Sequence, residues 1–152
     1  MSKTSRFVYV TFIRATSQKV WDALIQPEQT RLYWHGVTQA SDWTPDADWK
    51  MTLADGRVAD AGRVVEIDPP RHLVLEWRNE FMPELKAEGF SRCQFELSEE
   101  HGVTRLAVTH EIDVEGSKFI EAVSNGWPMI LSSLKSLLET GAPLGETLNK
   151  SG

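Results

Sequence analysis

His110 is the side chain best placed for acid–base chemistry. It falls in the alternating segment from Val103 to Ile112, on the same face as Leu106 and Val108. A histidine beside an apolar cavity could serve a cyclase or dehydratase as general acid or base, because its pKa lies near neutral. A core histidine bonded to a backbone or side-chain acceptor explains the same pattern. The second interpretation is favoured, since no other titratable group shares the predicted face.

The other histidines, the cysteine and the aspartates of the chain show no metal-binding pattern. Three histidines fall in predicted turns or at a strand start, without the spacing of a metal pair: His35, His72 and His101. Cys93 is the single cysteine and is expected to point inward as a small apolar side chain. Five aspartates lack the spacing of a calcium loop and are interpreted as solvated hairpin tips: Asp42, Asp46, Asp48, Asp55 and Asp60. The sequence therefore predicts neither a metal ion nor a cofactor.

Composition narrows the class of protein. The 152 residues fit one domain, expected over residues 1–143, with a flexible tail over 144–152. The net charge of −6 argues against nucleic-acid binding, which needs clustered lysine and arginine. No apolar run is long enough for a membrane span, and the N-terminus lacks the apolar segment of a secretory signal. With a lone cysteine, this predicts a cytoplasmic protein.

The predicted order of elements is one strand, two short helices, six strands and one long helix. Thr16 or Ser17 suits the N-cap of the first helix, and Pro27 suits the first turn of a second helix that ends near Trp34. Residues 79–89 are predicted as a loop. Alternating or β-branched residues predict strands over 7–14, 37–43, 49–53, 58–67, 73–78, 90–97 and 103–112.

The longest periodic segment is C-terminal. A helix is predicted to open at Gly126-Trp127-Pro128 and to end at Gly141, with apolar residues at helical spacing between them. Residues 113–125 are predicted as a linker, with at most a helical turn starting at Ser117. A proline deep inside a helix removes a backbone hydrogen bond, so the helix is expected to kink or restart at Pro128.

Alternation along the strands places charge on one face and apolar side chains on the other, as in an antiparallel sheet covered on one side. Gly62 is predicted to mark a bulge or bend. The sequence thus predicts an α+β helix-grip fold, in which a curved sheet of six to seven strands wraps around the C-terminal helix. A cavity is expected beside Gly126, although large side chains that fill the core explain the same aromatic residues. Its predicted lining is Trp34, Trp49, Met51, Trp77, Phe95, His110, Trp127 and Ile130, with Phe81 and Met82 as a lid.

Short segments along residues 6–141 stand in a distinctive order, and they include Val20-Trp21-Asp22-Ala23-Leu24, Pro27-Glu28, Asp55-Gly56, the run from Gly62 to Leu73, Phe95-Glu96-Leu97 and Gly126-Trp127. In this order they resemble the activator of heat-shock-protein-90 ATPase homologue-like family, within the START-like (SRPBCC) superfamily. The resemblance implies a hydrophobic cavity between helix and sheet. Members of the superfamily include lipid carriers, hormone receptors, polyketide cyclases and co-chaperone domains, so the fold does not fix the function.

Three functions from different classes follow as expectations. The first is binding of a small hydrophobic or amphipathic molecule in the cavity, with His110 as a polar anchor. The second, implied by the family, is a stress-response interaction with a chaperone. The third is an enzyme of the cyclase or dehydratase type that uses His110. The expected partner is a hydrophobic small molecule, and the chain is expected to be a monomer or a homodimer.

Overall fold

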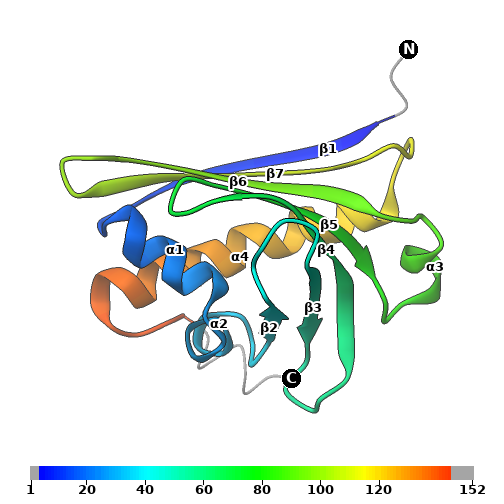
Figure 1. Cartoon of the computed structure of the whole chain (residues 1–152), viewed down its shortest axis with the longest axis horizontal. Helices are drawn as coiled ribbons and strands as arrows, with labels where there is room; N and C mark the ends of the chain where they lie inside the picture. The colour runs from blue at the N-terminus through cyan, green and yellow to red at the C-terminus, as the bar shows by residue number, and fades with distance from the viewer. Residues whose placement is uncertain (1–3, 145–152) are drawn as a thin grey trace.

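A strongly curved antiparallel sheet wraps around a long C-terminal helix (Figure 1). The computed structural model describes residues 4–144, so most of the predicted tail, residues 145–152, lies outside the described residues. The predicted α+β helix-grip fold is confirmed, with a sheet of seven strands. The strands are β1 (Ser5–Ile13), β2 (Thr38–Ser41), β3 (Asp48–Thr52), β4 (Val58–Asp68), β5 (His72–Asn79), β6 (Ser91–Glu100) and β7 (Val103–Ile112), and the helices are α1 (Ser17–Ile25), α2 (Pro27–Tyr33), α3 (Pro83–Lys86) and α4 (Lys118–Thr140).

The strand order is β1-β7-β6-β5-β4-β3-β2, and every neighbouring pair is antiparallel. From β2 to β7, strands that follow one another in sequence also pair, as short connections favour. The first strand instead pairs with the last, which leaves β1 and β2 as the two edges. In Figure 1, β1, β7 and β6 cross above α4, whereas β2 and β3 lie below it. The concave face of the sheet thus surrounds the helix.

The two short helices α1 and α2 follow their predicted signals. Thr16 caps α1, since its hydroxyl accepts a hydrogen bond from the backbone N–H of Lys19 at 3.2 Å. Pro27 occupies the first turn of α2, where a missing N–H costs nothing. Val20 and Tyr33 are buried, and α2 contacts both β2 and α4. The pair therefore closes one end of the curved sheet.

The long helix differs from its prediction. α4 is one helix that begins at Lys118 rather than at Gly126, and it runs through Pro128 without a break. Phe119 and Ile120 in its first turn are buried like Trp127, so both halves of the helix pack on the sheet. This packing outweighs the backbone hydrogen bond that the proline cannot donate. The predicted end is confirmed, because Gly141 forms the left-handed C-cap.

The segment predicted as a loop, residues 79–89, contains the short helix α3 and a carboxylate that caps α4. Pro83 starts α3, and Leu85 anchors it in the core. Glu88 then accepts hydrogen bonds from the backbone N–H groups of Lys118, at 2.9 Å, and Phe119, at 3.4 Å. A carboxylate at a helix N-terminus satisfies free N–H donors and interacts favourably with the helix dipole. Glu88 therefore supports the start of α4 together with the N-cap Ser117, whose hydroxyl accepts a hydrogen bond from the N–H of Ile120 at 3.1 Å.

Replacement of Glu88 by alanine is expected to lower the free energy of unfolding by about 1 to 2 kcal/mol, because two N–H groups lose their acceptor. Urea denaturation measures the effect. Glu84→Ala is the control, since Glu84 is exposed and lies in the same segment. Its expected effect is within about 0.5 kcal/mol. Equal losses in both variants would contradict the capping role of Glu88.

Candidate functional site

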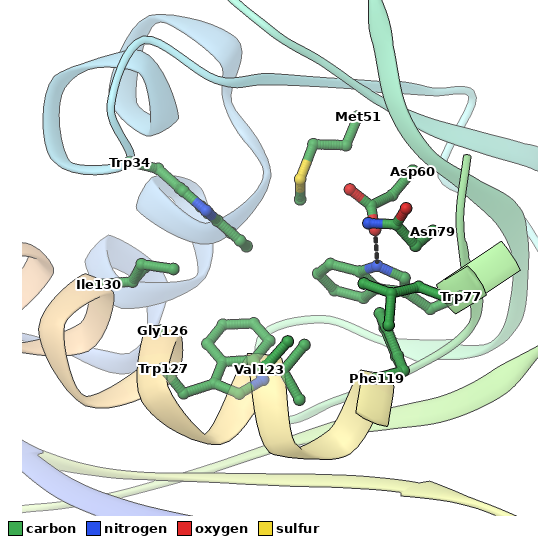
Figure 2. A pocket seen from close by; sticks show the side chains of 12 residues that line it. Trp34, Met51, Asp60, Trp77, Asn79, Phe119, Val123, Gly126, Trp127 and Ile130 are labelled. Carbon is green, nitrogen blue, oxygen red and sulfur yellow. Dashed lines mark hydrogen bonds between the residues drawn. The ribbon is translucent and has the colours of Figure 1, made fainter. Parts of the chain in front are cut away.

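A cavity of about 210 Å³ lies between the N-terminal half of α4 and strands β3, β4 and β5. Helix α2 and its C-cap close one side, and α3 lies at the other (Figure 2). The cavity is partly open to solvent. Its lining is mostly apolar and comprises Trp34, Met51, Asp60, Trp77, Asn79, Leu85, Phe119, Ala122, Val123, Gly126, Trp127 and Ile130.

Three tryptophans from different elements form the main walls. The ring centroid of Trp34 lies 5.3 Å from that of Trp127 and 6.2 Å from that of Trp77. Trp77 and Trp127 meet edge to face at 5.7 Å. Such tilted and T-shaped contacts are favourable arrangements for aromatic rings, and they hold each ring in one orientation. The three rings therefore pack directly against one another.

Gly126 has no side chain that could project from α4 into the cavity. A Cβ added there would lie 3.8 Å from the nearest atom, Cδ1 of Ile130, so nothing steric requires glycine at this position. A glycine inside a helix costs about 1 kcal/mol relative to alanine. The helix thus carries a destabilising residue at the point where a side chain would enter the cavity.

The opposite side of the cavity has a polar end. Met51, Asp60 and Asn79 are register partners across β3, β4 and β5, so they form one row across the sheet. Figure 2 shows the Asp60 carboxyl and the Asn79 amide close together, across the cavity from Trp34 and Ile130. The side-chain oxygen of Asn79 accepts hydrogen bonds from the N–H groups of Phe81 and Met82, at 3.0 and 2.7 Å. The amide nitrogen of Asn79 remains as a donor at the cavity.

The interpretation of Asp60 as a solvated hairpin residue is wrong. Its side chain is buried, with 8% of the residue exposed, and it lines the cavity. The available signal was the alternation along β4, which places Asp60, Gly62 and Val64 on one face, and Val64 is fully buried. Asn79 also lines the cavity, at the end of β5, although the sequence predicts a loop at this position.

Burial controls the electrostatics of Asp60. Loss of hydration, with a smaller contribution from the nearby charge of Glu80, raises its pKa from 3.8 to about 6. The indole N–H of Trp77 donates a hydrogen bond to Oδ2 of Asp60 at 2.6 Å and opposes this increase in the pKa. At neutral pH the cavity therefore contains a poorly solvated carboxylate.

His110 lies behind the tryptophan wall and is fully buried. The indole N–H of Trp127 donates to its Nδ1 at 3.2 Å, and its Nε2 lies 2.8 Å from Oγ of Ser91. The Ser91 hydroxyl donates in turn to the carbonyl of Trp77 at 2.7 Å, which assigns the ring proton to Nε2. Burial lowers the pKa of His110 to about 3, so the imidazole is neutral. This geometry favours a structural role for His110.

The other predicted residues divide into two groups. Trp34, Met51, Trp77, Trp127 and Ile130 line the cavity as expected. Trp49 lies behind the wall, with its ring centroid 4.7 Å from that of Trp77, and Phe95 lies 5.7 Å from Trp127. Phe81 is half exposed and stacks under the guanidinium of Arg57, away from the lining.

Residues 4–144 contain neither a metal-binding cluster of side chains nor a membrane-spanning helix. No group of three or more histidine, cysteine, aspartate or glutamate side chains in this range is arranged to hold a metal ion. No helix in the same range has the length and apolar character needed to cross a bilayer.

Comparison with known proteins identifies relatives. A protein from Cytophaga hutchinsonii, ChR145, has 24% identity and a TM-score of 0.73, over 93% of this chain and 98% of its own. An HSP90 activator from Plasmodium falciparum has 19% identity and a TM-score of 0.70, over 88% and 95%. The Aha1 dimer from Colwellia psychrerythraea has 19% identity and a TM-score of 0.70, over 90% and 98%. These likenesses show the shared fold.

No curated protein matches the sequence at a significant level. The sequence of residues 14–139, which is most of the chain, matches the family model described as activator of Hsp90 ATPase homolog 1-like protein. The chain therefore belongs to the family of activator of Hsp90 ATPase homolog 1-like proteins.

Proposed function

We propose that the protein binds a small apolar or amphipathic molecule in the cavity between α4 and the sheet. The observation that carries this proposal is a partly open cavity of about 210 Å³, with walls of mutually packed tryptophans and one polar end. Apolar pockets with a few placed polar groups are the usual form of small-molecule sites. Burial of ligand surface supplies about 25 cal/mol per Å² before the costs of ordering.

The volume limits the size of the ligand. An apolar cavity of about 150 Å³ in another protein accommodates benzene. The present cavity is somewhat larger, so it suits one substituted ring or a short chain. Sterols and flavonoids are too large to be enclosed. The function of the cavity is therefore best tested with single-ring probes.

Gly126→Leu is expected to abolish binding, because the new side chain enters the cavity from α4. The measurement is a two-dimensional NMR titration with benzyl alcohol, which in the unmodified protein should shift signals of Trp34, Trp77 and Trp127. Asn125→Leu is the matched control, since Asn125 is exposed on the same helix, outside the cavity lining. Binding that survives in Gly126→Leu would place the site elsewhere.

A second function is a protein interaction in chaperone regulation, which the family name suggests. The outer face of β1 exposes Val8, Val10 and Phe12, and β1 is an edge strand, so this face offers an apolar surface to a partner. A pull-down with the chaperone and an assay of its ATPase activity test this function. If the protein does not stimulate the ATPase, the function is excluded. The cyclase alternative gains no support, because His110 does not reach the cavity.

A further inference from the structure

We propose that the ligand of this cavity is a small apolar amine whose protonated head group binds the carboxylate of Asp60. This inference rests on the ligand-binding function proposed above and assigns the chemical class of the ligand. It is argued from the partners of Asp60, from the charges around it and from the aromatic walls.

The first argument is that Asp60 lacks enough partners for a buried carboxylate. Within residues 4–144 its carboxyl accepts a hydrogen bond from the indole of Trp77 and from no other side chain. An ionised carboxylate offers about four acceptor sites, and buried charges are normally paired. Asp60 lines the cavity, and in Figure 2 one of its oxygens is bonded to Trp77 while the other is bonded to none of the residues drawn. A donor from a ligand would complete this site.

The second argument is that the described part of the chain supplies no cation to Asp60. The nearest charged group acting on it is Glu80, which is also acidic. The two neighbouring cations, Arg78 and Lys86, both pair with Glu80 rather than with Asp60. Because no cation pairs with it, the carboxylate of Asp60 favours a cationic ligand and disfavours a carboxylate ligand.

The third argument is the aromatic lining. Trp34, Trp77 and Trp127 all border the cavity, and tryptophan is the side chain that attracts cations most strongly through its ring face. A carboxylate beside several tryptophans thus favours the head group of an amine, and the apolar residues of α4 favour its hydrocarbon part. The amide nitrogen of Asn79 can in addition donate to an oxygen atom of the same ligand.

The test uses four probes of nearly equal size: ethylbenzene, benzyl alcohol, benzylamine and benzoate. Each is titrated into the labelled protein at pH 7.5, where Asp60 and benzylamine are both charged. We expect benzylamine to bind about tenfold or more tightly than benzyl alcohol, since a hydrogen bond between charged groups is worth that factor. Benzoate should be the weakest.

Two variants assign the preference to Asp60. Asp60→Asn keeps an acceptor for the Trp77 indole but removes the charge, so benzylamine should bind it no more tightly than benzyl alcohol does. Glu84→Gln is the matched control, because it removes an exposed charge that does not line the cavity, and it should keep the preference.

The outcomes separate the two proposals. If ethylbenzene and benzyl alcohol bind as tightly as benzylamine, the amine inference is overturned, while the ligand-binding function stands. If the preference persists in Asp60→Asn, the assignment to this carboxylate is overturned. If none of the four probes shifts any signal, the ligand-binding function itself falls, and the inference falls with it.

Discussion

Replacement of Trp127 by alanine is expected to lower the free energy of unfolding by about 4 kcal/mol, which is typical for truncation of a buried tryptophan. The indole is 2% exposed and contacts Trp34, Trp77 and Phe95. Truncation creates a large void at the centre of the core. It also leaves Nδ1 of His110 without its donor. Urea denaturation followed by circular dichroism measures the change.

Trp127→Phe separates packing from hydrogen bonding. Phenylalanine fills most of the volume but cannot donate to His110, so about 2 kcal/mol of the loss should remain as the cost of an unsatisfied buried acceptor. A loss below about 2 kcal/mol in Trp127→Ala would show that the indole is not central to the core. If Trp127→Phe loses as much free energy of unfolding as Trp127→Ala, the contribution of the indole comes from the hydrogen bond alone.

Replacement of Asp60 by asparagine is expected to stabilise the protein by about 3 kcal/mol above pH 6. The pKa of Asp60 in the folded protein is about 6, against 3.8 ordinarily, and each unit of difference corresponds to about 1.4 kcal/mol. Asparagine keeps an oxygen that accepts from the Trp77 indole, but it carries no charge to desolvate. Urea denaturation of the unmodified protein and of Asp60→Asn, at pH values from about 3.5 to about 8, measures the difference in their free energies of unfolding.

The sign of the pH dependence follows from the direction of the shift. Because folding raises the pKa of Asp60, its contribution favours the folded state most below pH 3.8 and is lost as the pH rises through about 6. The stability gain of Asp60→Asn should therefore be small at low pH and reach its full size above pH 6. An unchanged or lower stability at pH 7.5 would show that other groups stabilise the carboxylate.

Folding shifts the pKa of His110 in the opposite direction, but this shift does not affect the comparison of the unmodified protein with Asp60→Asn. Folding lowers its pKa from 6.5 to about 3, so its contribution favours the folded state above pH 6.5 and is lost as the pH falls toward 3. Both proteins contain His110, so its effect cancels in the difference between their stabilities.

The carboxylate of Asp60 is thus a destabilising group beside a cavity. This is the pattern expected when function opposes stability.

The sequence by itself determined the helix-grip architecture. Alternation along the strands, the apolar stripe of the long helix and the glycine at position 141 are local signals, because each depends on residues only a few positions apart. For the same reason it predicted that Trp34, Met51, Trp77, Trp127 and Ile130 line the cavity. Each of these is a large apolar side chain on the buried face of its own element.

Only the tertiary structure decided the polar end of the cavity and the contact of Glu88 with the start of α4. Asp60 becomes a cavity residue because β3, β4 and β5 pair in a register that aligns it with Met51 and Asn79. The Ser117 N-cap of α4 is a local feature, but Glu88, 30 residues before Lys118, also meets the first N–H groups of the helix. Both features join segments that are distant in the sequence. No local pattern encodes such contacts, since the free energy that fixes them comes from the packing of the whole sheet around the helix.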